Sequence, residues 1–261
     1  MTTYSNPTVI PPSLNLEHIP SIYATHPSAK VSERYGFIPT SVIVHALGRA
    51  GFVAVKAQAA RASLERAAFA KHLIRFRHRE HMNTQVGDWL PEVVLVNSHD
   101  GSSSYQIMAG VYRLVCANGL VVGNSFAEAR VRHTKNAPDE IVDASFRVIE
   151  SLPGIADGIE SMRAITLESD EREAFAAAAL TLRYPDEAPI RPTQLLSTRR
   201  NADTSSDLWT TFNVLQENLL QGGQRRTDSR RRTRKISSVS EDVRLNRALW
   251  TLAEELKRLK T

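Results

Sequence analysis

A run of arginines near the C-terminus, residues 224–235 (QRRTDSRRRTRK), has the side chains best suited to binding a ligand. It holds seven basic residues and one acidic residue, a formal charge of +6, whereas the whole chain has a net charge of +5, so the rest of the chain is at −1. Each guanidinium can direct two N–H donors at phosphate oxygens, so this array predicts a polyanionic partner, with nucleic acid first. The alternative is a solvated, partly disordered loop that keeps the protein in solution. The candidate residues are Arg225, Arg226, Arg230, Arg231, Arg232, Arg234 and Lys235.

A second basic segment has a strand-like pattern at residues 71–79 (KHLIRFRHR). Alternate residues of a strand point to one face, which gathers three arginines on the same side. Such a face can follow a phosphate backbone while an aromatic ring stacks on a base. The alternatives are arginines paired with nearby carboxylates and aromatic rings packed in the core. The candidates are Arg75, Arg77 and Arg79 for phosphate, and Phe76 or Tyr105 for stacking.

The patterns associated with catalysis are incomplete. His78 and His81 are three residues apart, whereas the helical zinc-protease pattern places two histidines four apart beside a glutamate. Asp88, Glu92 and Asp100 resemble a nuclease carboxylate set, but no suitably placed lysine follows Glu92, so a metal-dependent nuclease is kept as a minority hypothesis. The sequence has no P-loop and no dinucleotide-binding glycine pattern. We therefore expect no catalytic residue, no metal and no cofactor.

Composition and length are those of an ordinary globular protein. The 261 residues are 42% hydrophobic and 23% charged, which fits one large domain or one domain with an appendage. The single cysteine, Cys116, has apolar neighbours, so we expect a core thiol with no intramolecular disulfide, in a reducing cytoplasm. No stretch approaches the roughly 20 apolar residues that span a bilayer, and the start lacks the regions of a signal peptide. We expect a cytoplasmic protein with no membrane association.

The N-terminal half predicts a mixture of helix and strand. Prolines dot residues 1–39, which favours an extended arm lying on the core. Thr40 or Ser41 can cap a helix that runs through Leu47. Strands are expected at residues 52–57, 71–79 and 91–98, with a turn at Asp100-Gly101, followed by strand-like runs at 120–122 and 129–133.

Residues 108–118 are ambiguous. Ile107, Met108, Val111 and Val115 fit helical spacing, whereas Tyr105, Ile107, Ala109 and Val111 fit strand alternation. We favour a helix ended by Gly119, although Asn118-Gly119 would serve equally well as a hairpin turn.

From Pro138 onward the pattern is helical. Two apolar faces near the C-terminus should pack as a helical hairpin with the arginine loop at its tip, or dock onto another subunit. Gly222-Gly223 ends the first of these helices, and Ser238-x-x-Glu241 has the spacing of a capping box for the second. The expected segments are a helix from 138 to a stop at Pro153, a helical region at 156–184, a linker at 185–204, and the two helices.

Together these elements predict an α+β fold: a small, mainly antiparallel sheet packed with helices, followed by a helical C-terminal region. The expected organisation is an arm at 1–39, a core domain at 40–200, and a two-helix region at 201–261 that carries the basic loop 224–235.

Residues 97–123 (NSHDGSSSYQIMAGVYRLVCANGLVVG) closely resemble the signature of the phage/plasmid-like family known as domain of unknown function 932. Further matches are KHLIRFR, Arg132-His133, Gln216-Glu217-Asn218, Gly222-Gly223 and residues 246–250 (NRALW). The resemblance implies a mobile-element setting, in which accessory proteins serve recombination, replication or defence evasion. It also suggests a distant similarity to single-strand annealing proteins of the Red-beta and Erf type.

The leading hypothesis is a non-enzymatic, homo-oligomeric DNA-binding protein that prefers single-stranded DNA and promotes annealing or recombination. The alternative is an interaction protein that inhibits a host defence or DNA-processing factor.

Overall fold

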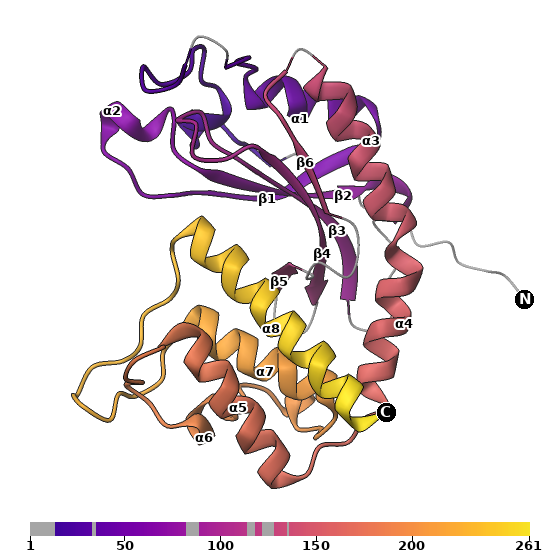
Figure 1. The fold of residues 1–261 in the computed structure, drawn as a ribbon, viewed down its shortest axis with the longest axis vertical. Helices are drawn as coiled ribbons and strands as arrows, with labels where there is room; N and C mark the ends of the chain where they lie inside the picture. Colours follow the sequence, from indigo (N-terminus) through magenta and orange to yellow (C-terminus); the bar gives the residue numbers. More distant parts are fainter. Residues whose placement is uncertain (1–13, 33–34, 82–88, 114–117, 122–127, 135) are drawn as a thin grey trace, which may run out of the picture. The chain divides into compact units, whose positions relative to one another are not determined.

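The computed structural model describes residues 14–32, 35–81, 89–113, 118–121, 128–134 and 136–261 (Figure 1). The chain divides into two compact units, residues 1–112 with 128–149 and residues 113–127 with 150–261. These divisions differ from the expected boundary at residue 200, because helices that precede residue 200 pack against those that follow it. The fold class is α+β, as the sequence predicted.

The first unit is built on an antiparallel sheet. Its strands follow the order β1-β2-β3-β4, with β6 pairing with β4. Strand β3 is buried at all nine positions, which explains its nearly continuous apolar sequence. The strands are β1 (Phe52–Ala59), β2 (His72–His78), β3 (Trp89–Asn97), β4 (Tyr105–Arg113) and β6 (Glu128–Val131).

Helices α1 (Thr40–Arg49) and α3 (Ala137–Glu150) belong to the same unit, together with the short elements η1 (Pro20–Ile22), α2 (Leu64–Ala67) and η2 (Arg79–His81). Phe52 of β1 lies edge-on to Phe146 of α3, with ring centroids 5.4 Å apart. The described part of the N-terminal arm packs on this core, since Leu16, Ile19 and Ile22 are buried.

The second unit is mainly helical, and its central helix is α7 (Leu208–Gln221). The first thirteen residues of α7 are all buried. Helices α4, α5, α6 and α8 all contact α7, so the last two helices pack against each other within one chain. No helix that the structure describes is long and apolar enough to cross a membrane. The remaining elements are β5 (Asn118–Val121), α4 (Leu152–Arg163), α5 (Ser169–Arg183), α6 (Pro192–Leu195), η3 (Asn201–Asp203) and α8 (Val239–Lys260).

The helix predicted at 108–118 is wrong, because Tyr105–Arg113 forms strand β4 and Asn118 begins β5. Both faces of β4 are buried at nearly every position, so its sequence lacks the alternation of apolar and polar residues that marks a strand with one exposed face. Gly110 permits this close packing, since a Cβ at this position would lie 2.7 Å from Val94 Cγ2. Cys116 lies outside the described residues.

Two other predictions in the helical part need correction. The helix that begins near Pro138 ends at Glu150, close to the stop predicted at Pro153, and Pro153 itself occupies the first turn of α4, where its missing N–H costs nothing. The region 156–184 is two helices, because residues between them pair with the start of α7: Leu167 N–H donates to Ser206 O at 3.0 Å. The linker expected at 185–204 contains α6 and η3 and buries Leu195.

Two arginines of β2 share one buried carboxylate on β3. Glu92, whose side chain is inaccessible to solvent, accepts from Arg75 Nη1 at 3.2 Å and from Arg77 Nη2 at 2.8 Å. Arg75 is itself only 3% exposed. A buried charge is tolerated only when it is compensated, and the Glu92 carboxylate compensates the buried Arg75 guanidinium.

Replacing Glu92 with Gln should lower the free energy of unfolding by about 3–5 kcal/mol, since it removes the buried negative charge that Arg75 and Arg77 share. Urea unfolding followed by circular dichroism measures this. Glu65→Gln, on the exposed surface of α2, is the control and should change stability by about 0.5 kcal/mol or less. A Glu92→Gln variant that unfolds like the control would contradict this role.

Candidate functional site

The basic segment 224–235 forms a hairpin between α7 and α8. Thr233 N–H donates to Gln224 O at 2.8 Å, and Arg226 N–H donates to Arg231 O at 3.0 Å. Arg225 and Arg232 form an antiparallel bridge between these two hydrogen bonds. Residues 227–230 therefore make the tip of a short ladder, which we call the basic hairpin.

The glycine pair Gly222-Gly223 ends α7, as the sequence predicted, and it also starts the hairpin. Gly222 and Gly223 have φ angles of +65° and +89°, a region that residues with a Cβ rarely adopt. A Cβ on Gly222 would lie 2.6 Å from Thr233 O, so the returning strand of the hairpin passes directly over this residue. The turn thus requires glycine both for conformation and for space.

Two arginines from outside the hairpin hold its base. Arg183, the last residue of α5, donates to the carbonyl oxygens of Leu219 and, at 2.5 Å, of Arg234. Arg199 donates to the carbonyl oxygen of Gly222 at 2.6 Å. The last carbonyls of a helix lack partners within it, so these two guanidinium groups complete the end of α7 and fix the chain that leaves it.

Asn218, within the Gln216-Glu217-Asn218 match, connects the same helix end to its surroundings. Its Oδ1 accepts from Arg199 Nε at 3.0 Å and from Gln224 Nε2 at 2.8 Å. Its Nδ2 donates to the carbonyl oxygens of Leu195 and Ser197. All the capacity of this buried amide is used to join α7, α6 and the first residue of the hairpin.

Further contacts hold the rest of the hairpin. Gln194 Nε2 donates to Arg225 O at 2.8 Å, and the backbone N–H of Thr227 donates to Pro189 O at 2.8 Å. The hairpin is thus anchored through its backbone, and most of its charged side chains take no part in this anchoring.

The charge of the hairpin is largely uncompensated. Its one acid, Asp228, accepts from Arg226 Nε at 2.7 Å, and this hydrogen bond lowers the pKa of the Asp228 carboxyl to about 2. Arg232 donates to the carbonyl oxygen of Gly223. The remaining cations are exposed and make no side-chain hydrogen bond or ion pair with any part of the chain that the structure describes: Arg225, Arg230, Arg231, Arg234 and Lys235.

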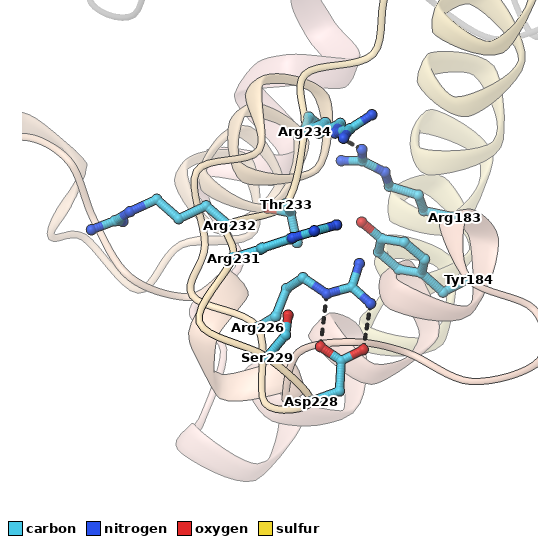
Figure 2. Close-up of a pocket in the computed structure, with 9 residues that line it drawn as sticks. All are labelled: Arg183, Tyr184, Arg226, Asp228, Ser229, Arg231, Arg232, Thr233 and Arg234. Carbon is cyan, nitrogen blue, oxygen red and sulfur yellow. Dashed lines mark hydrogen bonds and ion pairs between the residues drawn. The ribbon is translucent and has the colours of Figure 1, made fainter.

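A pocket of about 470 Å³ lies between the hairpin and the end of α5 (Figure 2). In Figure 2, Arg226 and Arg231 extend from the hairpin toward Tyr184, whose hydroxyl points into the gap, whereas Arg232 points away. The Arg183 guanidinium lies 5.2 Å from the centroid of the Tyr184 ring. The lining residues are Arg183, Tyr184, Arg226, Asp228, Ser229, Arg231, Arg232, Thr233 and Arg234.

The cationic strand face predicted for the first unit is not formed. Arg75 and Arg77 both bind Glu92, and the Arg77 guanidinium also lies 4.4 Å above the centre of the Tyr112 ring. Arg79 is exposed, but it lies in η2, beyond the end of the strand. The sequence could not reveal this arrangement, because the shared carboxylate lies on a neighbouring strand.

The aromatic residues proposed for base stacking are also in the core. Tyr105 is fully buried and donates its hydroxyl to Ile38 O at 2.9 Å, and Phe76 is fully buried. Both rings thus follow the alternative of ordinary core packing.

Arg183 and Tyr184 were missed by sequence reasoning, because they precede the hairpin by some forty residues in the chain. A cation in the last turn of a helix ended by Pro185 is a recognisable signal for carbonyl binding. It does not reveal that the carbonyls belong to another helix.

A buried polar cluster involves the Asn97-Ser98-His99 part of the family signature. The Thr40 hydroxyl lies 3.0 Å from His72 Nε2, 3.1 Å from His99 Nε2 and 3.0 Å from Asn97 Nδ2. His72 Nδ1 lies 3.1 Å from Ala70 O and must donate to it, so Thr40 donates to His72 Nε2 and accepts from the other two groups. Thr40 therefore does not cap α1, whose N-cap is Pro39.

Tyr35 and His133 extend this cluster. The Tyr35 hydroxyl lies 3.2 Å from both Ser98 O and His133 Nε2. Burial lowers the pKa of His72 to about 4 and of His99 to about 3, and it also lowers the pKa of His133. These histidines are neutral at pH 7 and serve as hydrogen-bonding groups that join the N-terminal arm to the sheet.

Among the described residues, no group of three or more His, Cys, Asp or Glu side chains is arranged to hold a metal ion. Asp88, one of the three carboxylates of the nuclease hypothesis, lies outside them.

The chain is similar to proteins whose names state no activity. The family model described as "Domain of unknown function (DUF932)" matches residues 27–250, which confirms the resemblance to domain of unknown function 932. UPF0380 protein YfjQ and UPF0380 protein YafZ, both of Escherichia coli (strain K12), are each 39% identical to this chain over 243 residues. These alignments cover 91% of this chain and 88% of each relative. No solved structure is significantly similar.

The buried histidines predict a loss of stability in mild acid. Between pH 6.5 and about 4 the unfolded chain binds protons on His72 and His99 that the folded protein does not bind. The free energy of unfolding should therefore fall as the pH decreases through this window, by up to about 1.4 kcal/mol per pH unit for each histidine. Urea unfolding at pH 6.5, 5.5 and 4.5 measures it.

A His72→Asn variant should show a shallower pH dependence over the same window, because one titrating group is gone. Equal slopes for the variant and the original protein would refute the assignment.

Proposed function

We propose that this chain, which belongs to the family described as Domain of unknown function (DUF932), binds nucleic acid through the basic hairpin, with a preference for single-stranded DNA and without catalysing a reaction. The observation that carries the proposal is an anchored hairpin that presents five exposed cations with no acidic partner in the described part of the chain.

Charge on a fixed backbone favours a phosphate polymer. Binding cations to a nucleic acid releases condensed counterions, which supplies affinity without any base contact. Hydrogen bonds to Pro189 and from Gln194 hold the hairpin backbone to the rest of the second unit. Less conformational entropy is then lost on binding than with a disordered basic tail.

The preference for single strands rests on arginine itself. Guanidinium planes can stack on unpaired bases while their N–H groups bind phosphate. Because Phe76 and Tyr105 are buried, we assign base stacking to the hairpin arginines.

Annealing requires that two strands be held near each other, which one hairpin cannot do alone. We therefore include in the proposal a homo-oligomer that places several hairpins along one strand. Light scattering with and without a long single-stranded DNA tests that part.

Replacing Arg230, Arg231 and Arg232 together with alanine should reduce the slope of log affinity against log salt by about 2 for single-stranded DNA, given a loss of about 0.7 per phosphate contact. Fluorescence anisotropy with a labelled oligonucleotide at several salt concentrations measures the slope, and a duplex of the same sequence measures the strand preference.

The matched control removes the same charge from exposed arginines of the first unit, Arg49, Arg61 and Arg132, and should leave the slope nearly unchanged. If both triple variants lose equal affinity, binding depends on net charge and not on the hairpin. If the original protein does not bind even at low salt, the proposal fails and the interaction with a host protein takes its place.

A further inference from the structure

The pocket behind the hairpin differs chemically from the outward face of the hairpin. Five arginines and one aspartate line it, but Arg232 points away from the gap (Figure 2), so the other five charged residues give a formal charge of +3 in about 470 Å³. This volume is in the range of small-molecule sites, but such sites are usually lined mainly by apolar side chains. The composition therefore indicates a small and strongly anionic ligand.

A segment within a nucleic acid strand matches this charge poorly. Each internal phosphodiester carries one negative charge. A pocket of this size holds about one nucleotide, which would leave roughly two positive charges uncompensated. A terminal phosphate adds about −1.5 to −2 at neutral pH, so a linear triphosphate group carries about −4 in a comparable space.

The donors that face the pocket also suit a chain of phosphate oxygens. Arg231 is exposed and has no partner among the described residues. The Tyr184 hydroxyl points toward the gap from the opposite side (Figure 2). Thr233 accepts from the Gln224 N–H at 3.1 Å, which leaves its hydroxyl hydrogen available to donate.

Arg183 gives the site a fixed wall. Its guanidinium is held by the carbonyl oxygens of Leu219 and Arg234, which are neutral, so the hydrogen bonds position its charge without cancelling it. Burial lowers the pKa of Arg183, and a bound anion would offset that cost.

We propose that this pocket binds a terminal triphosphate group. The group can come from a free nucleoside triphosphate or from the 5′ end of a primary RNA transcript, and both present the same oxygens to the arginines. This proposal does not depend on the binding of DNA by the outward face of the hairpin.

Isothermal titration calorimetry of the full chain with inorganic triphosphate tests the pocket. Binding should be at least about tenfold tighter than for orthophosphate, since more charge-assisted hydrogen bonds are made. Arg231→Ala should weaken triphosphate binding by about tenfold or more. Its neighbour Arg230, which has the same charge but does not line the pocket, supplies the matched control, and Arg230→Ala should weaken binding by about twofold at most.

The source of the group is tested with ATP and with a short RNA that has either a 5′-triphosphate or a 5′-hydroxyl. ATP binding as tightly as inorganic triphosphate supports a free nucleotide, whereas tighter binding of the 5′-triphosphate RNA than of either ATP or the 5′-hydroxyl RNA supports a strand end. Equal weakening by Arg230→Ala and Arg231→Ala, or no binding of triphosphate by the original protein, would overturn the proposal. DNA binding without triphosphate binding would remove the pocket and leave the proposed function intact.

Discussion

The carbonyl groups at the end of α7 are the constraint on which the candidate site depends. This helix is buried almost throughout, and a buried helix end must find donors for its last carbonyls. Arg183 and Arg199 supply those donors, and Gly222 turns the chain where a Cβ would collide with the returning strand. The same contacts that complete the helix therefore hold the base of the hairpin, and a run of arginines becomes an array with a defined shape.

Some arginines of this chain are compensated by buried carboxylates, whereas those of the hairpin are mostly exposed and uncompensated. In the sheet, Arg75 and Arg77 are compensated by the buried Glu92. In the second unit, Arg113 is similarly compensated by the buried Asp203, with a distance of 2.7 Å between Arg113 Nη1 and Asp203 Oδ1. These pairs allow a charge to lie in the interior and leave little for a ligand. The hairpin cations lack such carboxylates, so the distribution of acids, rather than the count of arginines, distinguishes the candidate site.

Much of the fold could be predicted from local patterns. The strands β1 to β3, the glycine stop after α7 and the Ser238 cap of α8 each depend on a few adjacent residues, and the structure confirms them. Strand β4 was mistaken for a helix because burial on both faces removes its alternation.

The site was only partly predictable for a related reason. The arginine run identified the hairpin, since charge density is visible in the sequence. The partners that decide which arginines are free are distant in sequence: Glu92 lies on the strand beside Arg75, and Arg183 and Tyr184 end a helix some forty residues before the hairpin. The signature around Asn97 and His99 identified the family, yet in the structure these residues form a hydrogen-bonded cluster centred on Thr40.

Photo-crosslinking of a single-stranded oligonucleotide that contains a photoreactive base, followed by mass spectrometry of the peptides, tests the central claim most directly. The account predicts crosslinks to residues 225–235 that disappear as salt is raised. Crosslinks confined to the first unit, around residues 72–79, or none at low salt, would contradict it.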